Sequence, residues 1–132
     1  MDTPKGILIE KAYEALKNAY APYSGFRVGA ALLCKSGKIY TGCNVENASY
    51  GATICAERVA ISKAVCDGED DFTAICIVSD PNKGPCYPCG ICRQVMSEHC
   101  SGNFEIILPN SDNMEIYTLS SLLPYGFSKE NL

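Results

Sequence analysis

Three cysteines in two separate segments have the residue types and spacing of a metal site. Cys89 and Cys92 are three positions apart where a helix is predicted to begin, so both side chains can reach a common ion. Cys55 stands at the start of another predicted helix and completes the set if the two helices begin side by side. A helix N-terminus also favours the thiolate that zinc requires. The pattern therefore predicts one zinc ion per chain, held by Cys55, Cys89 and Cys92.

Glu57 and Arg58 follow Cys55 and supply the other groups that a reactive zinc site needs. Three protein ligands leave the fourth tetrahedral position open for water, which distinguishes a catalytic zinc from a closed structural one. Glu57 can point towards the ion without binding it, which is where a proton-transferring carboxylate belongs. Arg58 or Arg93 can hydrogen-bond a thiolate and offset the charge of the three sulfurs. The segment predicts a zinc ion that activates water, with Glu57 placed beside it to move protons.

A different interpretation of the cysteines stays open at this point. Cys86, Cys89 and Cys92 form a C-x-x-C-x-x-C run that could join Cys55 in a closed, structural four-cysteine zinc site. An iron–sulfur cluster is disfavoured, because Met96 stands where the bacterial ferredoxin pattern requires a fourth cysteine. The role of Cys86 decides between a catalytic site and a structural module.

The composition limits the classes of partner and compartment. The chain has 132 residues, 47% of them hydrophobic, which suits one domain over residues 1–132. Its net charge of -4 offers no basic surface for nucleic acid, so we expect no DNA or RNA partner. No apolar stretch approaches the roughly 20 residues of a membrane helix. Nine cysteines without a secretory leader indicate free thiols in the cytoplasm. Cys34, Cys43, Cys66 and Cys76 are expected to be core residues.

Hydrophobic periodicity predicts alternating helices and strands that place these residues. The pattern implies a mixed sheet with helices on its faces. The tail begins at Pro124. The expected elements are a helix from about Pro4 to Tyr20, a hairpin of strands Phe26 to Cys34 and Ile39 to Val45, a helix from Cys55 to Val65, a strand from Asp71 to Ser79, a loop from Asp80 to Pro88, a helix from Pro88 to His99, strands at Phe104 to Leu108 and Met114 to Thr118, and a short helix from Leu119 to Leu123.

Six motifs in a fixed order resemble the small, homotetrameric, zinc-dependent cytidine deaminases. The resemblance runs from about Ala12 to Phe127. It implies an α/β protein with a three-layer α/β/α fold and a mixed five-stranded sheet. The motifs are Asn18-Ala-Tyr-Ala-Pro-Tyr-Ser24, Phe26-Arg-Val-Gly-Ala-Ala-Leu32, Gly42-Cys-Asn-Val-Glu-Asn-Ala48, Cys55-Ala-Glu-Arg58, Pro88-Cys-Gly-Ile-Cys-Arg-Gln94 and Leu122-Leu-Pro124.

The resemblance also implies an activity, which is the deamination of cytidine and deoxycytidine to uridine and deoxyuridine in pyrimidine salvage. Hydroxide adds to C4 of the cytosine ring, and Glu57 moves protons from the water to N3 and then to the departing amine. The protein is expected to be a homotetramer acting on a small nucleoside. The implied substrate-binding residues are Asn44 and Glu46 at the ribose, Phe26 at the base, Ala56, and Tyr50 and Phe127, the last two completing a neighbouring subunit's pocket.

A related enzyme that deaminates an antibiotic such as blasticidin S is the nearest alternative activity. Glu46 argues against it, because a carboxylate at the sugar position suits a ribose with free hydroxyls. Nucleotides are disfavoured as substrates because no Gly-rich loop or basic cluster marks a phosphate site.

Overall fold

The structure is a computed structural model that describes residues 3–80 and 84–132. The predicted loop from Asp80 to Pro88 and the predicted domain over 1–132 therefore lie partly outside the described residues. The helices are α1 (Pro4–Leu16), α2 (Ala56–Cys66), α3 (Gly90–His99) and α4 (Leu119–Leu122), with short 3-10 turns at Tyr50–Ala52 and Lys129–Asn131. The strands are β1 (Val28–Cys34), β2 (Ile39–Cys43), β3 (Phe72–Ser79), β4 (Glu105–Asn110) and β5 (Asn113–Thr118).

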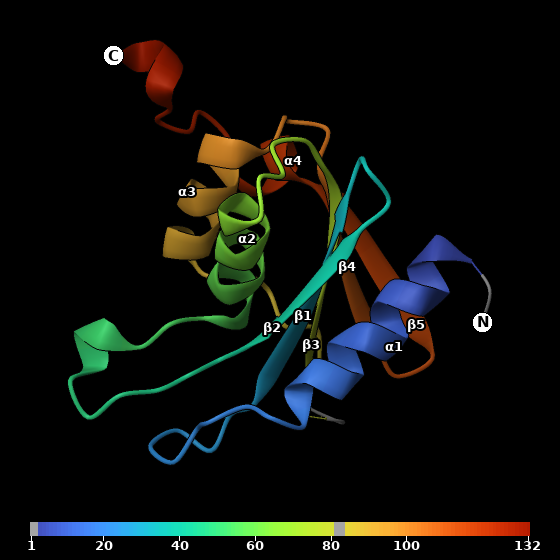
Figure 1. The fold of residues 1–132 in the computed structure, drawn as a ribbon, viewed down its shortest axis with the longest axis vertical. Helices are drawn as coiled ribbons and strands as arrows, with labels where there is room; N and C mark the ends of the chain where they lie inside the picture. The colour runs from blue at the N-terminus through green and yellow to red at the C-terminus, as the bar shows by residue number, and fades with distance from the viewer. Residues whose placement is uncertain (1–2, 81–83) are drawn as a thin grey trace.

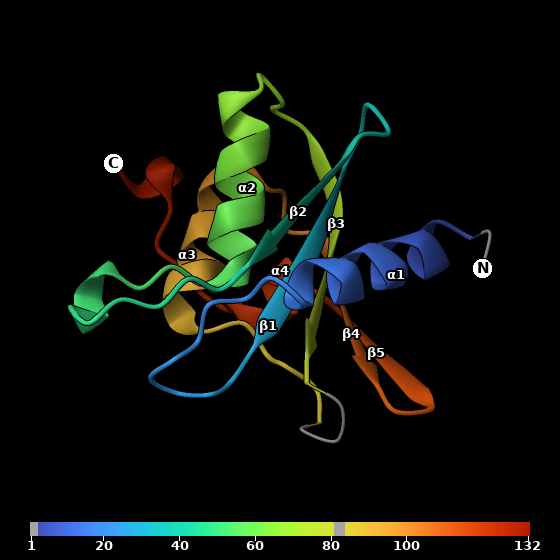
Figure 2. The ribbon, with the colours of Figure 1, turned by 60° about the horizontal axis from the view of Figure 1, so that its bottom comes forward.

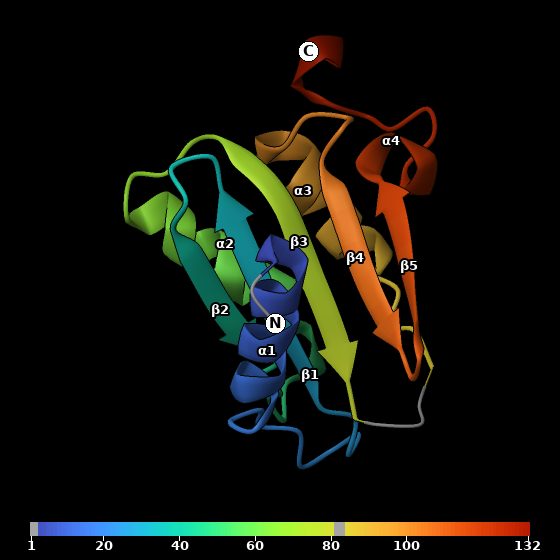
Figure 3. The same ribbon diagram turned by 90° about the vertical axis from the view of Figure 1, so that its right-hand side faces the viewer.

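The strands form one mixed sheet in the order β2-β1-β3-β4-β5. β3 and β4 are parallel, whereas the other neighbouring pairs are antiparallel. Figures 1 and 3 show α1 on one face of this sheet and α2 and α3 on the other. The predicted α/β/α arrangement with a five-stranded sheet is confirmed. Among the described helices, none is both long enough and apolar enough to span a bilayer.

Apolar side chains fill the space on both faces of the sheet, because successive residues of a strand point to opposite sides. The cluster under α1 contains Leu8, Ala12, Leu16, Ala31, Ala74, Cys76, Val78 and Ile107. The larger cluster, under α2 and α3, includes Val28, Ala30, Leu32, Ala56, Ile61, Ile75, Ile77, Cys92 and Met96. The larger cluster thus holds Ala56 and Cys92, two residues of the predicted site, against the sheet.

Two glycines let the helices approach the sheet closely. A Cβ atom at Gly29 would lie 2.1 Å from the backbone oxygen of Ala12 in α1. A Cβ atom at Gly42 would lie 2.5 Å from the backbone oxygen of Ala56 and 2.7 Å from the nitrogen of Ala60. All three distances are far inside van der Waals contact. Gly42 therefore allows the first turn of α2, where the predicted site begins, to pack directly on β2.

Several predicted boundaries were wrong: β2 ends at Cys43 instead of Val45, α3 begins at Gly90 instead of Pro88, and two further boundaries differ for identifiable reasons. The first helix ends at Leu16 instead of continuing to Tyr20, because the Tyr20 amide donates to the Asn44 carbonyl oxygen over 2.9 Å. The first strand begins at Val28 instead of Phe26. Before Val28, the side chains of Asn44 and Asp80 hydrogen-bond to the Phe26 carbonyl oxygen and the Arg27 amide, in place of a neighbouring strand. The predicted hairpin is confirmed by the antiparallel pairing of β1 and β2.

Candidate active site

Cys55 and Cys89 occupy equivalent positions, each as the residue that precedes a helix. Cys55 is the N-cap of α2 and Cys89 the N-cap of α3. Figures 1 and 2 show these two helices side by side and beginning at the same end of their layer. Cys92 lies in the first turn of α3. The fold therefore brings together the three thiols that the spacing predicts.

The separations between the sulfur atoms suit a tetrahedral zinc ion. The Sγ atoms of Cys55 and Cys89 are 3.9 Å apart, and those of Cys89 and Cys92 are 3.6 Å apart. All three Sγ atoms lie within 4.8 Å of one another. Tetrahedral zinc with Zn–S bonds of about 2.3 Å would separate its ligand sulfurs by about 3.8 Å. The three thiols therefore fit zinc with little rearrangement.

Arg58 provides positive charge beside the sulfurs. Its Nη2 atom donates to Cys55 Sγ over 3.5 Å and to the Thr53 carbonyl oxygen over 3.4 Å. Hydrogen bonding with Cys92, together with the Arg58 guanidinium, lowers the pKa of the Cys55 thiol to about 5. The hydrogen bond to Cys55 raises the pKa of the Cys92 thiol. A metal ion that binds all three sulfurs must therefore displace the Cys92 proton.

Glu57 lies in the first turn of α2 and is only 4% exposed. Removal from water raises the pKa of its carboxyl to about 7, and the nearby Cys55 thiolate acts in the same direction. The three-thiol group among the described residues does not include Glu57. A carboxyl with these properties can both accept and return a proton near neutral pH.

Cys86 lies near the site but outside the thiol cluster. Burial is the main cause that raises the pKa of its thiol to about 12, and the charges of Glu57 and Cys55 contribute. Among residues 3–80 and 84–132, the group that could hold a metal consists of Cys55, Cys89 and Cys92. This geometry favours three ligands over the closed four-cysteine alternative.

The cysteines outside the site differ in exposure. Cys34 and Cys76 are buried, as predicted for core residues, and Cys43 is partly buried. The prediction was wrong for Cys66, which is exposed at the end of α2. All nine cysteines are free thiols.

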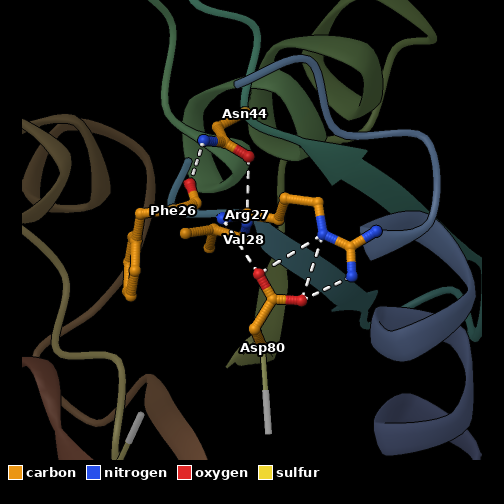
Figure 4. Close-up of polar contacts among 5 residues, drawn as sticks. All are labelled: Phe26, Arg27, Val28, Asn44 and Asp80. Atoms are coloured by element: carbon orange, nitrogen blue, oxygen red, sulfur yellow. Dashed lines mark hydrogen bonds and ion pairs between the residues drawn. The ribbon is translucent and has the colours of Figure 1, made fainter. Parts of the chain in front are cut away.

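Asn44 follows β2, and its side chain is hydrogen-bonded to the backbone before and at the start of β1. Its Oδ1 atom accepts from the Val28 amide over 2.9 Å, and its Nδ2 atom donates to the Phe26 carbonyl oxygen over 2.8 Å (Figure 4). An amide group has two donor hydrogens and two acceptor positions, so one of each is left for another partner. Asn44 therefore positions Phe26 and can still contact a ligand.

Glu46 is hydrogen-bonded to the loop before β1. Its Oε1 atom accepts from the backbone amides of Tyr23 over 2.9 Å and Ser24 over 3.1 Å, and its Oε2 atom accepts from the Ser24 hydroxyl. The Ser24 hydroxyl is the main cause that lowers the pKa of Glu46. Sequence reasoning missed these contacts, since no periodic pattern relates residues that are 22 and 23 positions apart.

The aromatic residues predicted to surround the substrate are accessible in the single chain. Phe26 is 37% exposed, Tyr50 77% and Phe127 60%. Figures 1 and 2 show that the segment around Tyr50 projects from the body of the molecule. The Tyr23 and Tyr50 rings are in edge-to-face contact with centroids 6.1 Å apart. The chain alone does not cover these rings.

Arg93 and Gln94, whose roles the sequence leaves open, tie other segments to α3. Arg93 donates from Nε to the Pro88 carbonyl oxygen over 2.8 Å and from Nη1 to the Leu122 carbonyl oxygen over 2.7 Å. Gln94 donates to the Phe127 carbonyl oxygen over 2.8 Å. Arg93 thus holds the segment before the Cys89 ligand, and Gln94 holds the C-terminal tail.

The chain is similar to known proteins over almost all its length. Residues 4–106 match the family model described as the cytidine and deoxycytidylate deaminase zinc-binding region. The cytidine deaminase of Sporosarcina psychrophila is 50% identical, with 100% of this chain and 96% of the relative covered. The cytidine deaminase structure from Burkholderia pseudomallei is 45% identical, with a TM-score of 0.89 and coverage of 95% and 100%.

A relative named for a different activity is less similar. The blasticidin-S deaminase of Bacillus cereus is 30% identical, with 92% of this chain and 91% of the relative covered. The family model, the fold and the three-thiol cluster agree with the resemblance seen in the motifs. The chain belongs to the zinc-binding cytidine and deoxycytidylate deaminase family.

Proposed function

We propose that this protein deaminates cytidine and deoxycytidine hydrolytically, giving uridine or deoxyuridine and ammonia. The observation that carries the proposal is the buried Glu57 beside three thiols that fit one zinc ion. The named activity of two relatives, each 50% identical to this chain, supports the same reaction. We place the reaction in pyrimidine salvage, with Cys55, Cys89 and Cys92 as ligands and the site within a single domain over residues 1–132.

Proton transfer is the task of Glu57 in this proposal. Zinc, when bound by the three thiols, makes water acidic enough to supply hydroxide near neutral pH. Glu57 accepts the proton that the water loses and gives it to N3 as hydroxide adds to C4. It then takes the proton of the new C4 hydroxyl and gives it to the amino nitrogen. The C4–N bond breaks, ammonia leaves, and C4 becomes a carbonyl. Burial of Glu57 suits this double role, because bulk water cannot exchange the proton.

Substrate recognition is assigned to residues that the fold brings to the start of β1. We propose that Asn44 and Glu46 bind the ribose hydroxyls and that Phe26 contacts the cytosine ring. Asn44 keeps one donor and one acceptor for this purpose. Ala56 is fully buried, so its proposed contact would use the backbone at the first turn of α2.

The exposed aromatic residues support a homotetramer in which neighbouring chains complete each site. Tyr50 and Phe127 lie on a projecting segment and on the tail, and both are mostly exposed. Burying such rings between subunits would both stabilise an assembly and exclude water from the substrate. Gln94 holds the Phe127 backbone and so directs the tail.

Mixing two defective variants tests whether one subunit completes the site of its neighbour. Glu57→Gln protein lacks the proton carrier but retains Phe127, whereas Phe127→Ala protein has the reverse defect. After subunit exchange, we expect cytidine turnover above the sum of the two separate proteins. Light scattering should give the mass of four chains. Formation of mixed assemblies with no gain in turnover would oppose a role for Phe127 across the interface.

We also propose that the protein works in the cytoplasm on small molecules. All nine thiols are free, which matches a reducing compartment. The net charge of -4 offers no general attraction for nucleic acid.

Ammonia release from a panel of substrates tests the activity. We expect zinc-loaded protein to release ammonia from cytidine and deoxycytidine, and to do so much more slowly from deoxycytidylate and blasticidin S. Faster release from blasticidin S would favour the activity of the more distant relative. A folded, zinc-loaded protein that releases no ammonia from any of them would instead favour a structural zinc module.

Replacing Cys86 by Ser tests the ligand set. Because Cys86 lies outside the cluster, we expect the zinc content to stay at about one ion per chain. Cys92→Ser, which removes a member of the cluster, is the matched comparison and should lower the zinc content. Loss of zinc in the Cys86 variant would contradict the three-cysteine assignment.

A further inference from the structure

The chain before β1 is held from both sides by side chains of neighbouring strand ends. On the β2 side, Asn44 bonds the Phe26 carbonyl oxygen and the Val28 amide. On the β3 side, the Arg27 amide lies 3.4 Å from Asp80 Oδ2 (Figure 4). The backbone ladder between β1 and β3 ends at the pair Val28 and Ser79. Asp80 therefore extends the attachment beyond the last backbone pair.

Arg27 and Asp80 also form a multiply bonded ion pair. Arg27 Nε lies 3.0 Å from Asp80 Oδ1 and 3.3 Å from Oδ2, and Nη2 lies 2.5 Å from Oδ1. The two residues are 53 positions apart in the sequence. A guanidinium that engages a carboxylate through two nitrogens has a more defined geometry than a single point contact. The pair thus fixes both the backbone and the side chain of Arg27 relative to β3.

The pair lies on the other side of the strand from the Phe26 ring. Neighbouring side chains of an extended chain point to opposite sides, and the side chains of Phe26 and Arg27 do so in Figure 4. Val28 packs in the cluster that contains Ala56 and Cys92, next to the thiol site. In Figure 4 the Phe26 ring points away from the Arg27 guanidinium. Anchoring Arg27 on one face consequently sets the direction of Phe26 towards the helix layer of the site.

We propose that Arg27 and Asp80 are positioning residues for substrate binding, which act by fixing Phe26 at the end of β1. This inference rests on the proposed function, since it concerns the ring that contacts the base. Phe26 is 37% exposed, so packing restrains it only in part. The side chains of Arg27 and Asp80 are 44% and 20% exposed and touch neither the thiols nor Glu57 in any described hydrogen bond or ion pair. Arg27 and Asp80 therefore affect the reaction indirectly, by fixing the segment that carries Phe26.

Loss of the pair should impair binding more than chemistry. Arg27→Ala should raise KM for cytidine, and the inhibition constant of the product uridine, by about threefold to tenfold, the range for one exposed but multiply bonded ion pair. The turnover number should change less than twofold, because Glu57 and the thiols are untouched. Arg27→Lys keeps the charge but not the planar fork, so it should recover part of the lost affinity.

An ion pair at the opposite end of the same two strands provides the matched control. Lys35 Nζ lies 3.8 Å from Asp71 Oδ2, and both side chains are more than half exposed. Lys35→Ala should leave KM, turnover and the uridine inhibition constant unchanged. If loss of an ion pair acted only by destabilising the ends of β1 and β3, Arg27→Ala and Lys35→Ala would have the same effect.

The decisive experiment is a double-mutant cycle of Arg27→Ala and Asp80→Ala, with steady-state kinetics and amide hydrogen exchange of residues 26–28. Asp80 takes part in a further interaction, so Arg27→Ala is the cleaner single variant. We expect the double variant to bind no worse than the weaker single one, and residues 26–28 to exchange faster in each. Unchanged KM in Arg27→Ala, or independent additive effects, would overturn the inference. A wild-type protein that does not deaminate cytidine would instead refute the proposed function, and the exchange data would still report whether the pair holds the segment.

Discussion

The Arg58 guanidinium donates a hydrogen bond to the Cys55 sulfur over 3.5 Å, from a position three residues further along the same helix. Three thiolates around a divalent ion carry a net negative charge, which makes the ion a weaker activator of water. A guanidinium beside one of them withdraws part of that charge and also stabilises the thiolate before the ion binds. The same short segment, residues 55–58, thus carries a ligand, the proton carrier and the group that balances charge.

Replacing Arg58 by Ala should weaken zinc binding by about 10- to 100-fold, the usual effect of losing a hydrogen bond to a metal ligand. Competition with a calibrated chelator measures this affinity. Lys63→Ala is a suitable control, because Lys63 lies in the last turn of the same helix and donates to the Thr41 carbonyl oxygen. Equal zinc affinity in wild-type and Arg58→Ala protein would show that the hydrogen bond to Cys55 does not support the site.

Gly42→Ala should destabilise the fold by about 1–3 kcal/mol, the range for forcing an extra carbon atom into a packed interior. The new Cβ would lie 2.5 Å from the Ala56 oxygen, so the first turn of α2 must move. Because that turn carries Glu57, turnover should fall as well. Chemical denaturation and steady-state kinetics measure the two effects.

Gly102→Ala serves as the control for Gly42→Ala, because a Cβ at Gly102 would meet the Ser120 Cβ at 3.5 Å, an ordinary van der Waals contact, and Gly102 is not among the residues proposed to bind zinc or substrate. We expect its stability to match that of the wild type. A Gly42→Ala protein as stable and active as Gly102→Ala would contradict the close approach of α2 to β2.

Glu46 should give the fold a measurable pH dependence. The Ser24 hydroxyl is the main cause that lowers the Glu46 pKa from its ordinary value of 4.5. A carboxyl with a depressed folded-state pKa stabilises the fold above its unfolded pKa and loses that contribution as pH falls through the folded pKa. The stability difference between wild type and Glu46→Gln should therefore be constant above about pH 5.5 and shrink below about pH 4.5.

Thermal unfolding of the two proteins at stepped pH values tests the Glu46 prediction. Ser24→Ala, which removes the hydroxyl donor, should make the decline smaller and make it end at a higher pH than in the wild type, because the folded-state pKa of Glu46 moves closer to the unfolded-state pKa. A stability difference that is independent of pH, or that grows towards acid, would show that the hydrogen bonds do not favour the ionised carboxylate.

The parts of the site that depend on short-range spacing could be predicted from the sequence. Cys89 and Cys92 share a helix start, and Glu57 follows Cys55 within one turn, so local geometry alone relates them. The hairpin around Gly37 could be predicted in the same way, because a short polar segment separates two apolar runs in the sequence. These predictions need no knowledge of how distant segments pack.

Contacts between distant segments could not be predicted in this way. The ion pair of Arg27 with Asp80 and the bonds of Glu46 to Ser24 depend on which strand ends become neighbours. The strand order that decides this is set by the packing of both sheet faces, not by any local pattern. Another tertiary contact, from the Tyr20 amide to the Asn44 carbonyl oxygen, explains why the first helix ends at Leu16, where helical periodicity alone would have continued it.

Proton transfer by Glu57, at a site where three cysteines hold zinc, is the step on which the proposed activity depends. It is tested most directly by following the ultraviolet absorbance of cytidine with wild-type and Glu57→Gln protein, each with zinc content and thermal stability measured. We predict conversion to the uridine spectrum by the wild type and a turnover about 10²- to 10⁴-fold lower in the variant, with zinc and fold retained. A zinc-loaded, folded Glu57→Gln protein that turns over cytidine at the wild-type rate would contradict this role of Glu57.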